Sequence, residues 1–192
     1  MQRWKNSLFN IAFGLNCLLL FLLLFENKLS IPVWLQVVGR MHPLILHFPL
    51  VMVVLYALTT LFAGFKKENN NEIFRTLTGF LLLLAALTSV LTSLAGLFLS
   101  REDGYDAEAL FWHKWSGAAI SFLTLGWYYF SKRVQSKKIV SIFTSTVALL
   151  LIVFAGHQGA GITHGQNFLL APMLPEKKQP VVSPEEAFVF AD

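Results

Sequence analysis

The sequence predicts an all-α integral membrane protein, a helical bundle of about five transmembrane helices with a cytoplasmic N-terminus and a periplasmic C-terminus. Its 192 residues are 55% hydrophobic and only 14% charged, and the mean hydropathy is +0.60. Several apolar runs reach the length of about 18 residues that a helix needs to cross a bilayer. One run holds only leucine and phenylalanine from Leu18 to Phe25. It is therefore apolar on every face of a helix, unlike a half-exposed helix of a soluble protein.

The first expected span is the apolar run 8–25. It is long for the hydrophobic region of a signal peptide, and the residues after it offer no small-residue cleavage site, so we expect it to be retained. The connection 27–41 contains Pro32 and Trp34 among enough apolar residues to lie along the membrane surface. We treat 1–41 as one unit, formed by the first span and an interfacial connection.

Four further spans are expected to form a membrane domain over residues 42–170. Polar segments separate them, and the last span should end where a glycine-rich stretch begins. The remaining segment, 171–192, is polar and rich in Pro, Lys and Glu, which is typical of a periplasmic linker or tail. The four spans are expected at residues 43–64, 75–100, 112–130 and 139–156.

Two prolines mark the start of the second span. Pro43 suits a first helical turn, where its missing N–H would have had no partner. Pro49 lies deeper and should bend the helix, because the carbonyl of Ile45 loses its hydrogen bond there.

The basic residues predict the orientation. With the N-terminus inside, nine Lys and Arg residues fall on the cytoplasmic side and six on the periplasmic side, which satisfies the positive-inside rule. The basic residues occur in short clusters between apolar spans, which is typical of membrane topology and not of a nucleic-acid interface. The six on the periplasmic side are Lys28, Arg40, Arg101, Lys114, Lys177 and Lys178.

This topology brings every histidine to the periplasmic side, although they are far apart in the sequence. An ionisable residue at membrane depth is costly and therefore indicates a functional site. His42 and His47 are separated by about 140° around a regular helix, so they cannot both face one ion. We favour His47 as the buried ligand and regard His42 as the weaker candidate. The full set is His42, His47, His113, His157 and His164.

Non-covalent b-type haem is the cofactor that this pattern favours. Haem needs one or two axial nitrogens, usually from different helices, and small residues against which the ring can lie. Cys17 is the only cysteine, so no covalent CxxCH attachment exists in this chain. Arg40, Arg101 and Lys114 lie at the outer boundary, where haem propionates need cations. Small residues occur in the third span (Thr88, Ser89, Thr92, Ser93, Ala95, Gly96), the fourth (Gly117, Ala118, Ser121) and after the fifth (Gly156, Gly159, Gly161).

Other interpretations remain open. Imidazole also suits copper or zinc, with His47, His113, His157 and His164 as ligands. Histidine can act as acid or base in proton or quinol chemistry. A third alternative is a cofactor-free structural subunit or anchor in a larger complex. Singly, each of these histidines and cations is also compatible with simple contacts to lipid headgroups.

Three segments together resemble a known family. They are His42–Pro49 (HPLILHFP), Trp112–Gly117 (WHKWSG) and Gly156–Gly165 (GHQGAGITHG). They are similar to an uncharacterised bacterial family of multi-span membrane domains of unknown function, often fused N-terminal to planctomycete-type cytochrome c domains. All five histidines fall on the positions of this pattern, which covers about residues 40 to 170. Ala160 and Ile162 depart from it, each by a mild substitution.

The resemblance implies a multi-pass protein of the bacterial inner membrane with an electron carrier on its periplasmic side. Combined with the histidines, it predicts an electron-transfer subunit that binds b-type haem near the periplasmic face and passes electrons to a c-type cytochrome. Quinol is a candidate electron source, in which case the protein would belong to a quinol-oxidising complex.

Overall fold

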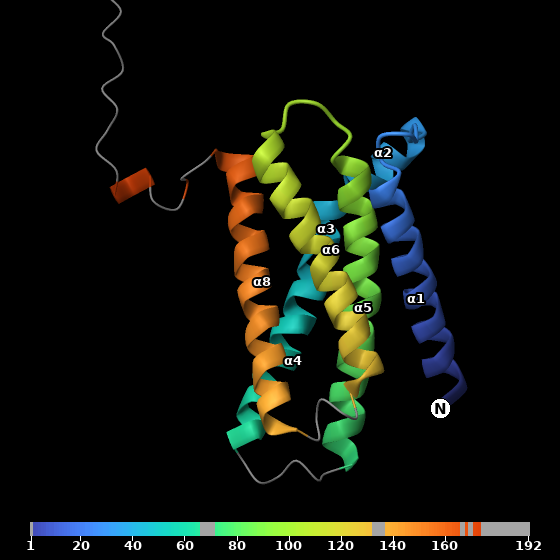
Figure 1. Ribbon diagram of the computed structural model, residues 1–192, viewed down its shortest axis with the longest axis vertical. Helices are drawn as coiled ribbons and strands as arrows, with labels where there is room; N and C mark the ends of the chain where they lie inside the picture. The colour runs from blue at the N-terminus through green and yellow to red at the C-terminus, as the bar shows by residue number, and fades with distance from the viewer. Residues whose placement is uncertain (1, 66–71, 132–136, 166–167, 169–170, 174–192) are drawn as a thin grey trace, which may run out of the picture.

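The computed structural model describes residues 2–65, 72–131, 137–165, 168 and 171–173. The prediction of an all-α protein is confirmed, because every regular element in this part of the chain is a helix (Figure 1). The five long helices are α1 (Gln2–Leu24), α4 (His47–Phe65), α5 (Glu72–Leu99), α6 (Ala107–Tyr129) and α8 (Lys138–His164). The short ones are α2 (Val33–Gly39), α3 (His42–Ile45) and the 3₁₀ helix η1 (Ala171–Met173).

Helices long and apolar enough to cross a membrane account for four of the expected spans. They cover Arg3–Leu24, Val33–Phe62, Glu72–Leu99 and Ile139–His164, so the second of them takes in α2, α3 and most of α4. The fifth long helix, α6, is 23 residues long and packs against both α5 and α8. The protein is therefore a helical membrane protein that contacts lipid. The side of the membrane on which each end lies stays a prediction.

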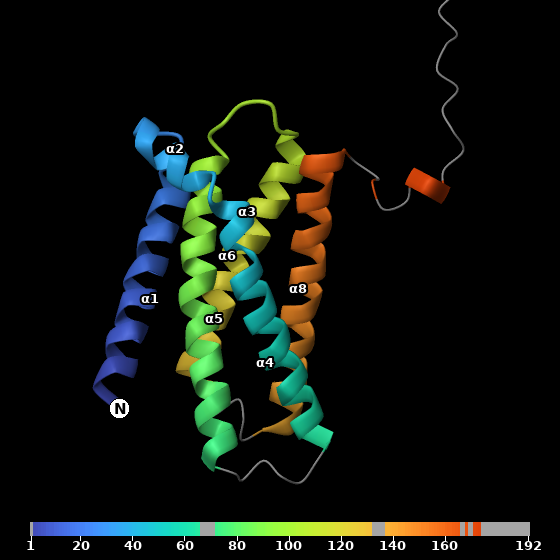
Figure 2. The same cartoon turned by 180° about the vertical axis from the view of Figure 1, so that it is seen from behind.

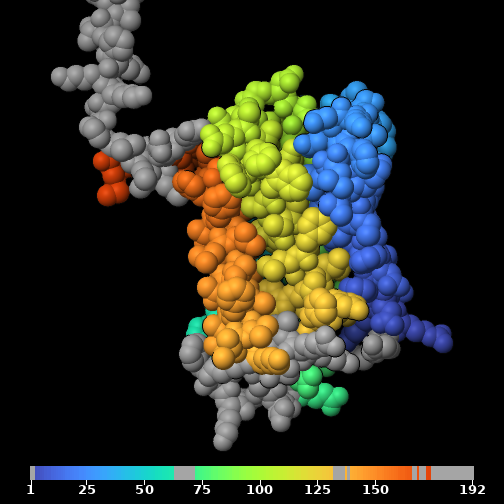
Figure 3. Space-filling view, in the orientation of Figure 1, coloured from blue at the N-terminus to red at the C-terminus, as the bar shows by residue number. Residues whose placement is uncertain are grey.

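Helices α4, α5, α6 and α8 form a four-helix bundle, and α1 lies beside α5 on the side away from α8 (Figures 1 and 2). We call the end where α5 and α8 finish and α6 begins the upper end, as in Figure 1. The N-terminus lies at the opposite end. Figure 3 shows α6 exposed between α8 and α1 on one face of the molecule.

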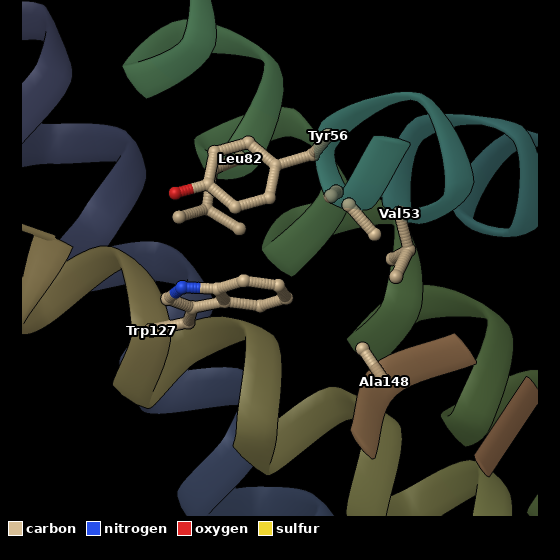
Figure 4. Close-up of a cluster of buried hydrophobic side chains, with 7 residues drawn as sticks. Val53, Tyr56, Leu82, Trp127 and Ala148 are labelled. Carbon is tan, nitrogen blue, oxygen red and sulfur yellow. The ribbon is translucent and has the colours of Figure 1, made fainter. Parts of the chain in front are cut away.

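The bundle core is built around two aromatic rings. Tyr56 is 0% exposed and Trp127 is 4% exposed, and their rings meet edge to face with centroids 4.7 Å apart (Figure 4). This geometry is favourable for aromatic pairs. Lower in the same core, the hydroxyl groups of Thr60 and Ser145 lie 2.7 Å apart and join α4 to α8. The cluster consists of Val53, Tyr56, Ala57, Leu82, Ala85, Trp127 and Ala148.

Helix α1 docks through a buried polar contact as well as apolar packing. Asn16 is 3% exposed, donates to the carbonyl of Ala12 at 2.9 Å and accepts from the Ser121 hydroxyl at 2.9 Å. Both polar groups are thereby paired, as burial in a membrane protein requires. Leu19 and Leu23 pack around this contact against α5.

The prolines behave as predicted. Pro43 lies in the first turn of α3. The helix breaks at Leu46, between α3 and α4, four residues after His42 and three before Pro49. The Ile45 carbonyl, which Pro49 cannot bond, accepts instead from the Thr92 hydroxyl at 3.5 Å. The bend therefore also attaches this segment to α5.

The predicted end of the last span is wrong. The stretch after residue 156 was expected to be a loop because of its glycines, but α8 continues to His164. The cap Gly165, at φ 89°, ends it. Glycine costs about 1 kcal/mol relative to alanine inside a helix, and tertiary contacts override that cost here. The predicted linker 171–192 lies outside the described residues, apart from η1.

Gly39 fixes how α2 sits on α5. A Cβ at this buried position would lie 2.6 Å from the backbone nitrogen of Leu99, which cannot move aside. We expect Gly39→Ala to lower the free energy of unfolding by about 1–3 kcal/mol, as overpacked sites do. Unfolding in mixed detergent micelles, followed by circular dichroism, measures this. In Gly14→Ala the added Cβ meets no atom within 4 Å, so that control should be neutral or stabilising. Equal stability of the two variants would contradict the expectation.

Candidate functional site

His42 is held against α5 from the start of α3. Its Nδ1 lies 2.9 Å from the carbonyl oxygen of Thr92. Because a carbonyl only accepts, this nitrogen carries the proton, and Nε2 is left with the lone pair. The ring lies over Gly96, where a Cβ would come within 2.9 Å of its Cε1 and Nδ1 atoms. Glycine at position 96 therefore leaves room for the imidazole ring. We call a glycine that leaves room for a histidine ring in this way a glycine seat.

His113 repeats the arrangement between α6 and α8. Its Nδ1 lies 2.8 Å from the carbonyl oxygen of Ala155, so it too donates from Nδ1. The ring lies over Gly159, where a Cβ would come within 3.0 Å of Cε1 and 3.2 Å of Nδ1. In both helices the glycine follows the accepting carbonyl by four residues, the spacing that places it on the same face one turn along. A side chain there would cover the carbonyl.

The two seats bring the imidazoles together. The ring centroids of His42 and His113 are 6.0 Å apart and the planes are almost perpendicular, at 89°. Both histidines are half-buried. Among the described residues, neither Nε2 has a hydrogen-bond partner. The pair therefore presents two imidazoles, each oriented by a backbone carbonyl that accepts from Nδ1.

This is the form in which histidine binds a metal. A ligating imidazole usually donates its other N–H to a carbonyl or carboxylate, which fixes the tautomer and raises the basicity of the ligand. The donor chemistry of the pair thus suits a group that takes imidazole nitrogens, such as a haem iron.

The small-residue faces have a different role from the one expected. Gly96 and Gly159 seat the imidazoles themselves. The Ser93 hydroxyl donates to the carbonyl of Gly117 at 3.2 Å, so α5 and α6 touch directly at that level. The small faces therefore explain helix packing and the two histidine seats, and the case for haem depends on the donor pair alone.

The other three histidines do not join the pair. His47, His157 and His164 are exposed, and the ring of His164 packs edge-on against Phe168 with centroids 4.4 Å apart. The expectation that His47 is more buried than His42 is wrong. The predicted divergence around the helix holds. However, the carbonyl of Thr92 directs His42 inward, which turns His47 outward. The sequence contains no signal for that choice.

Within the described residues, no three or more His, Cys, Asp or Glu side chains are placed to hold a metal ion. His47, His113, His157 and His164 were the candidate copper or zinc ligands, and of these only His113 belongs to the pair.

The three expected propionate-binding cations each have a partner within the chain. Arg40 pairs with Glu102 at 2.7 Å, Lys114 donates to both carboxylate oxygens of Glu26 at 2.7 and 2.8 Å, and an Nη of Arg101 donates to the Glu26 carbonyl. Sequence reasoning missed Glu26. The available signal was an acid directly after the first span, at the level where Lys114 enters the membrane.

Comparison with known proteins gives a family and no function. A family model described as "Predicted membrane protein (DUF2231)" matches residues 40–167. This range contains all five histidines and the whole bundle from α3 to α8, whereas α1 and α2 precede it. The resemblance to a membrane family of unknown function is thereby confirmed. No curated protein and no solved structure matches the chain.

The glycine seats can be tested without any cofactor. We expect Gly96→Ala to displace the His42 ring and Gly159→Ala to displace the His113 ring, breaking the hydrogen bond from Nδ1 in each case. ¹⁵N NMR of the histidine-labelled protein reports this as a changed Nδ1 shift for one histidine only. Matched controls lie on the same helices: a Cβ at Gly79 or Gly156 meets no atom within 4 Å. Unchanged imidazole shifts in both seat variants would refute the arrangement.

The Glu26–Lys114 ion pair should contribute to the docking of α1. Its side chains are only 21% and 16% exposed. We expect a double-mutant cycle with Glu26→Gln and Lys114→Met to give a coupling energy of about 1 kcal/mol, measured by unfolding in mixed micelles. The control cycle on Arg40 and Glu102, where Arg40 is 69% exposed, should give a coupling near zero. Equal couplings would show that the partial burial of the first pair has no effect.

Proposed function

Because the chain belongs to the DUF2231 family of predicted membrane proteins, we propose its function from the geometry of its histidine pair. The protein is an electron-transfer subunit of the bacterial inner membrane. His42 and His113 would hold a b-type haem near the periplasmic face, and the haem would pass electrons to a c-type cytochrome. The observation that carries this proposal is the pair of imidazoles with centroids 6.0 Å apart, each donating from Nδ1 to a carbonyl.

The chain's own residues would do three things at this site. The carbonyls of Thr92 and Ala155 hold the proton on Nδ1 and keep each Nε2 available as a ligand. Gly96 and Gly159 let the rings approach those carbonyls. The helix packing around the pair holds the two ring centroids 6.0 Å apart. A bound haem would supply one-electron redox chemistry.

Acidic residues at the upper end favour the docking of a partner with a basic surface. Asp103 and Glu108 are exposed in the segment that joins α5 to α6 and in the first turn of α6. This segment lies at the end of the helix that carries His113. A negative patch favours the docking of a positively charged protein face and increases its association rate. A c-type cytochrome with a basic face around its haem edge would meet this requirement.

Absorption spectroscopy of the purified protein tests the proposal. We expect reduced-minus-oxidised haem bands and a pyridine haemochrome, both lost in His42→Ala and in His113→Ala. His47→Ala, His157→Ala and His164→Ala are matched controls of the same residue type, and we expect them to retain the bands. A wild-type protein without extractable haem would refute the proposal. In that case bound copper or zinc would favour the metal-binding alternative, and a metal-free protein would favour the structural subunit.

A further inference from the structure

His157 lies on a lipid-facing stripe of α8. Leu150 and Val153 on this side are 64% and 69% exposed, and Phe154, one turn before His157, is 39% exposed. Only 17% of the apolar window of α8 is buried inside the bundle. His157 lies seven residues before the end of the helix, about 10 Å along its axis. Its imidazole is therefore presented to the membrane, below the upper end of the bundle.

A free imidazole is out of place in such a position. Among the described residues, the His157 ring has no hydrogen-bond partner. A polar group left unpaired away from water costs about 1–3 kcal/mol. Ionisable side chains at membrane depth generally face a bundle interior or a bound ligand. His42 and His113 meet this requirement through backbone carbonyls, whereas the described part of the chain supplies no such partner to His157.

Exposed aromatic side chains near His157 indicate the chemical class of a ligand for this position. Trp112 on α6 and Phe154 on α8 are in contact, with centroids 6.1 Å apart, and Phe111 packs against Trp112 at 5.3 Å. All three rings are also exposed, at 46%, 39% and 49%. We call Phe111, Trp112 and Phe154 the aromatic face. Phe154 and His157 are three residues apart on one helix and so lie on the same side.

We propose that His157 and the aromatic face bind the head group of a lipid-soluble quinone. A quinone is a flat ring, so it can stack on one of Trp112 and Phe154 and meet the other edge-on, since the planes of these two rings are 82° apart. A quinone carbonyl accepts a hydrogen bond and a quinol hydroxyl donates one, which matches the N–H and the lone pair of the His157 ring. A quinone also reaches a lipid-facing site by lateral diffusion within the bilayer, which a water-soluble ligand does not.

The position of this site fits an electron source for the histidine pair. Trp112 directly precedes His113, and Phe154 directly precedes Ala155, whose carbonyl binds His113. The aromatic face and the pair are therefore adjacent on both helices. The role of the reduced form, the quinol, as electron donor rests on the proposed function, whereas the binding of the quinone head group does not.

Photocrosslinking of the full chain in lipid nanodiscs tests the binding. The probe is an azido-substituted short-chain quinone, and the adducts are mapped by peptide mass spectrometry. We expect adducts in the peptides that contain Trp112 and Phe154, suppressed by excess decyl-ubiquinone. His157→Leu should raise about tenfold the concentration of decyl-ubiquinone that suppresses the adducts, which corresponds to about 1.4 kcal/mol. Phe154→Leu should change it in the same direction. His164→Leu and Phe143→Leu are controls on the same exposed helix and should leave this concentration unchanged.

The outcomes separate this inference from the proposed function. Adducts spread along all lipid-facing helices would overturn the inference. It would also be overturned if His157→Leu and His164→Leu changed the suppression of adducts by decyl-ubiquinone equally. Protection of the aromatic face by a second copy of the chain in a nanodisc dimer would overturn it as well. Haem spectra are recorded on the same preparations: site-specific adducts without haem refute only the proposed function, and haem without site-specific adducts refutes only the quinone site.

Discussion

The arrangement of the bundle depends on a hydrogen bond that occurs twice. In each case a histidine N–H donates to a helix carbonyl that no side chain covers, because the residue one turn further along is glycine. His42 reaches Thr92 over Gly96, and His113 reaches Ala155 over Gly159. Inside a membrane every polar group needs a partner, and these bonds pair each imidazole while tying together two helices. They also determine the tautomer. The same contacts thus stabilise helix packing and prepare a ligand.

Helix α1 adds to this arrangement from outside the matched family range. It binds the bundle through Asn16 and Ser121 at mid-depth and through Glu26 and Lys114 at the upper end. Lys114 follows His113 in the sequence, so the ion pair also restrains the turn of α6 that carries the imidazole. The cations that were predicted to bind a cofactor's propionates instead bind acidic side chains or a carbonyl of the chain itself.

The fold was largely predictable from sequence, because a bilayer imposes one simple requirement on every span. Hydropathy located the apolar helices, and the prolines located the break between α3 and α4. The end of α8 was missed because glycine was read by its propensity, whereas Gly159 is required by the approach of His113. The site was predictable only as a set of histidines at one end. Which of them converge depends on hydrogen bonds to the carbonyls of Thr92 and Ala155, and backbone carbonyls carry no sequence signal.

The two histidine seats also reveal an internal correspondence between the halves of the bundle. The first half, α3 to α5, and the second, α6 and α8, each descend from the upper end and return to it (Figure 1). Each contributes one imidazole near its start and one glycine seat near its finish. The halves are thus topological equivalents about an axis along the membrane normal, as in parallel repeats of other membrane proteins. The imidazole pair lies at the boundary between them, so a small rotation of one half against the other would change the separation of the rings without altering either seat.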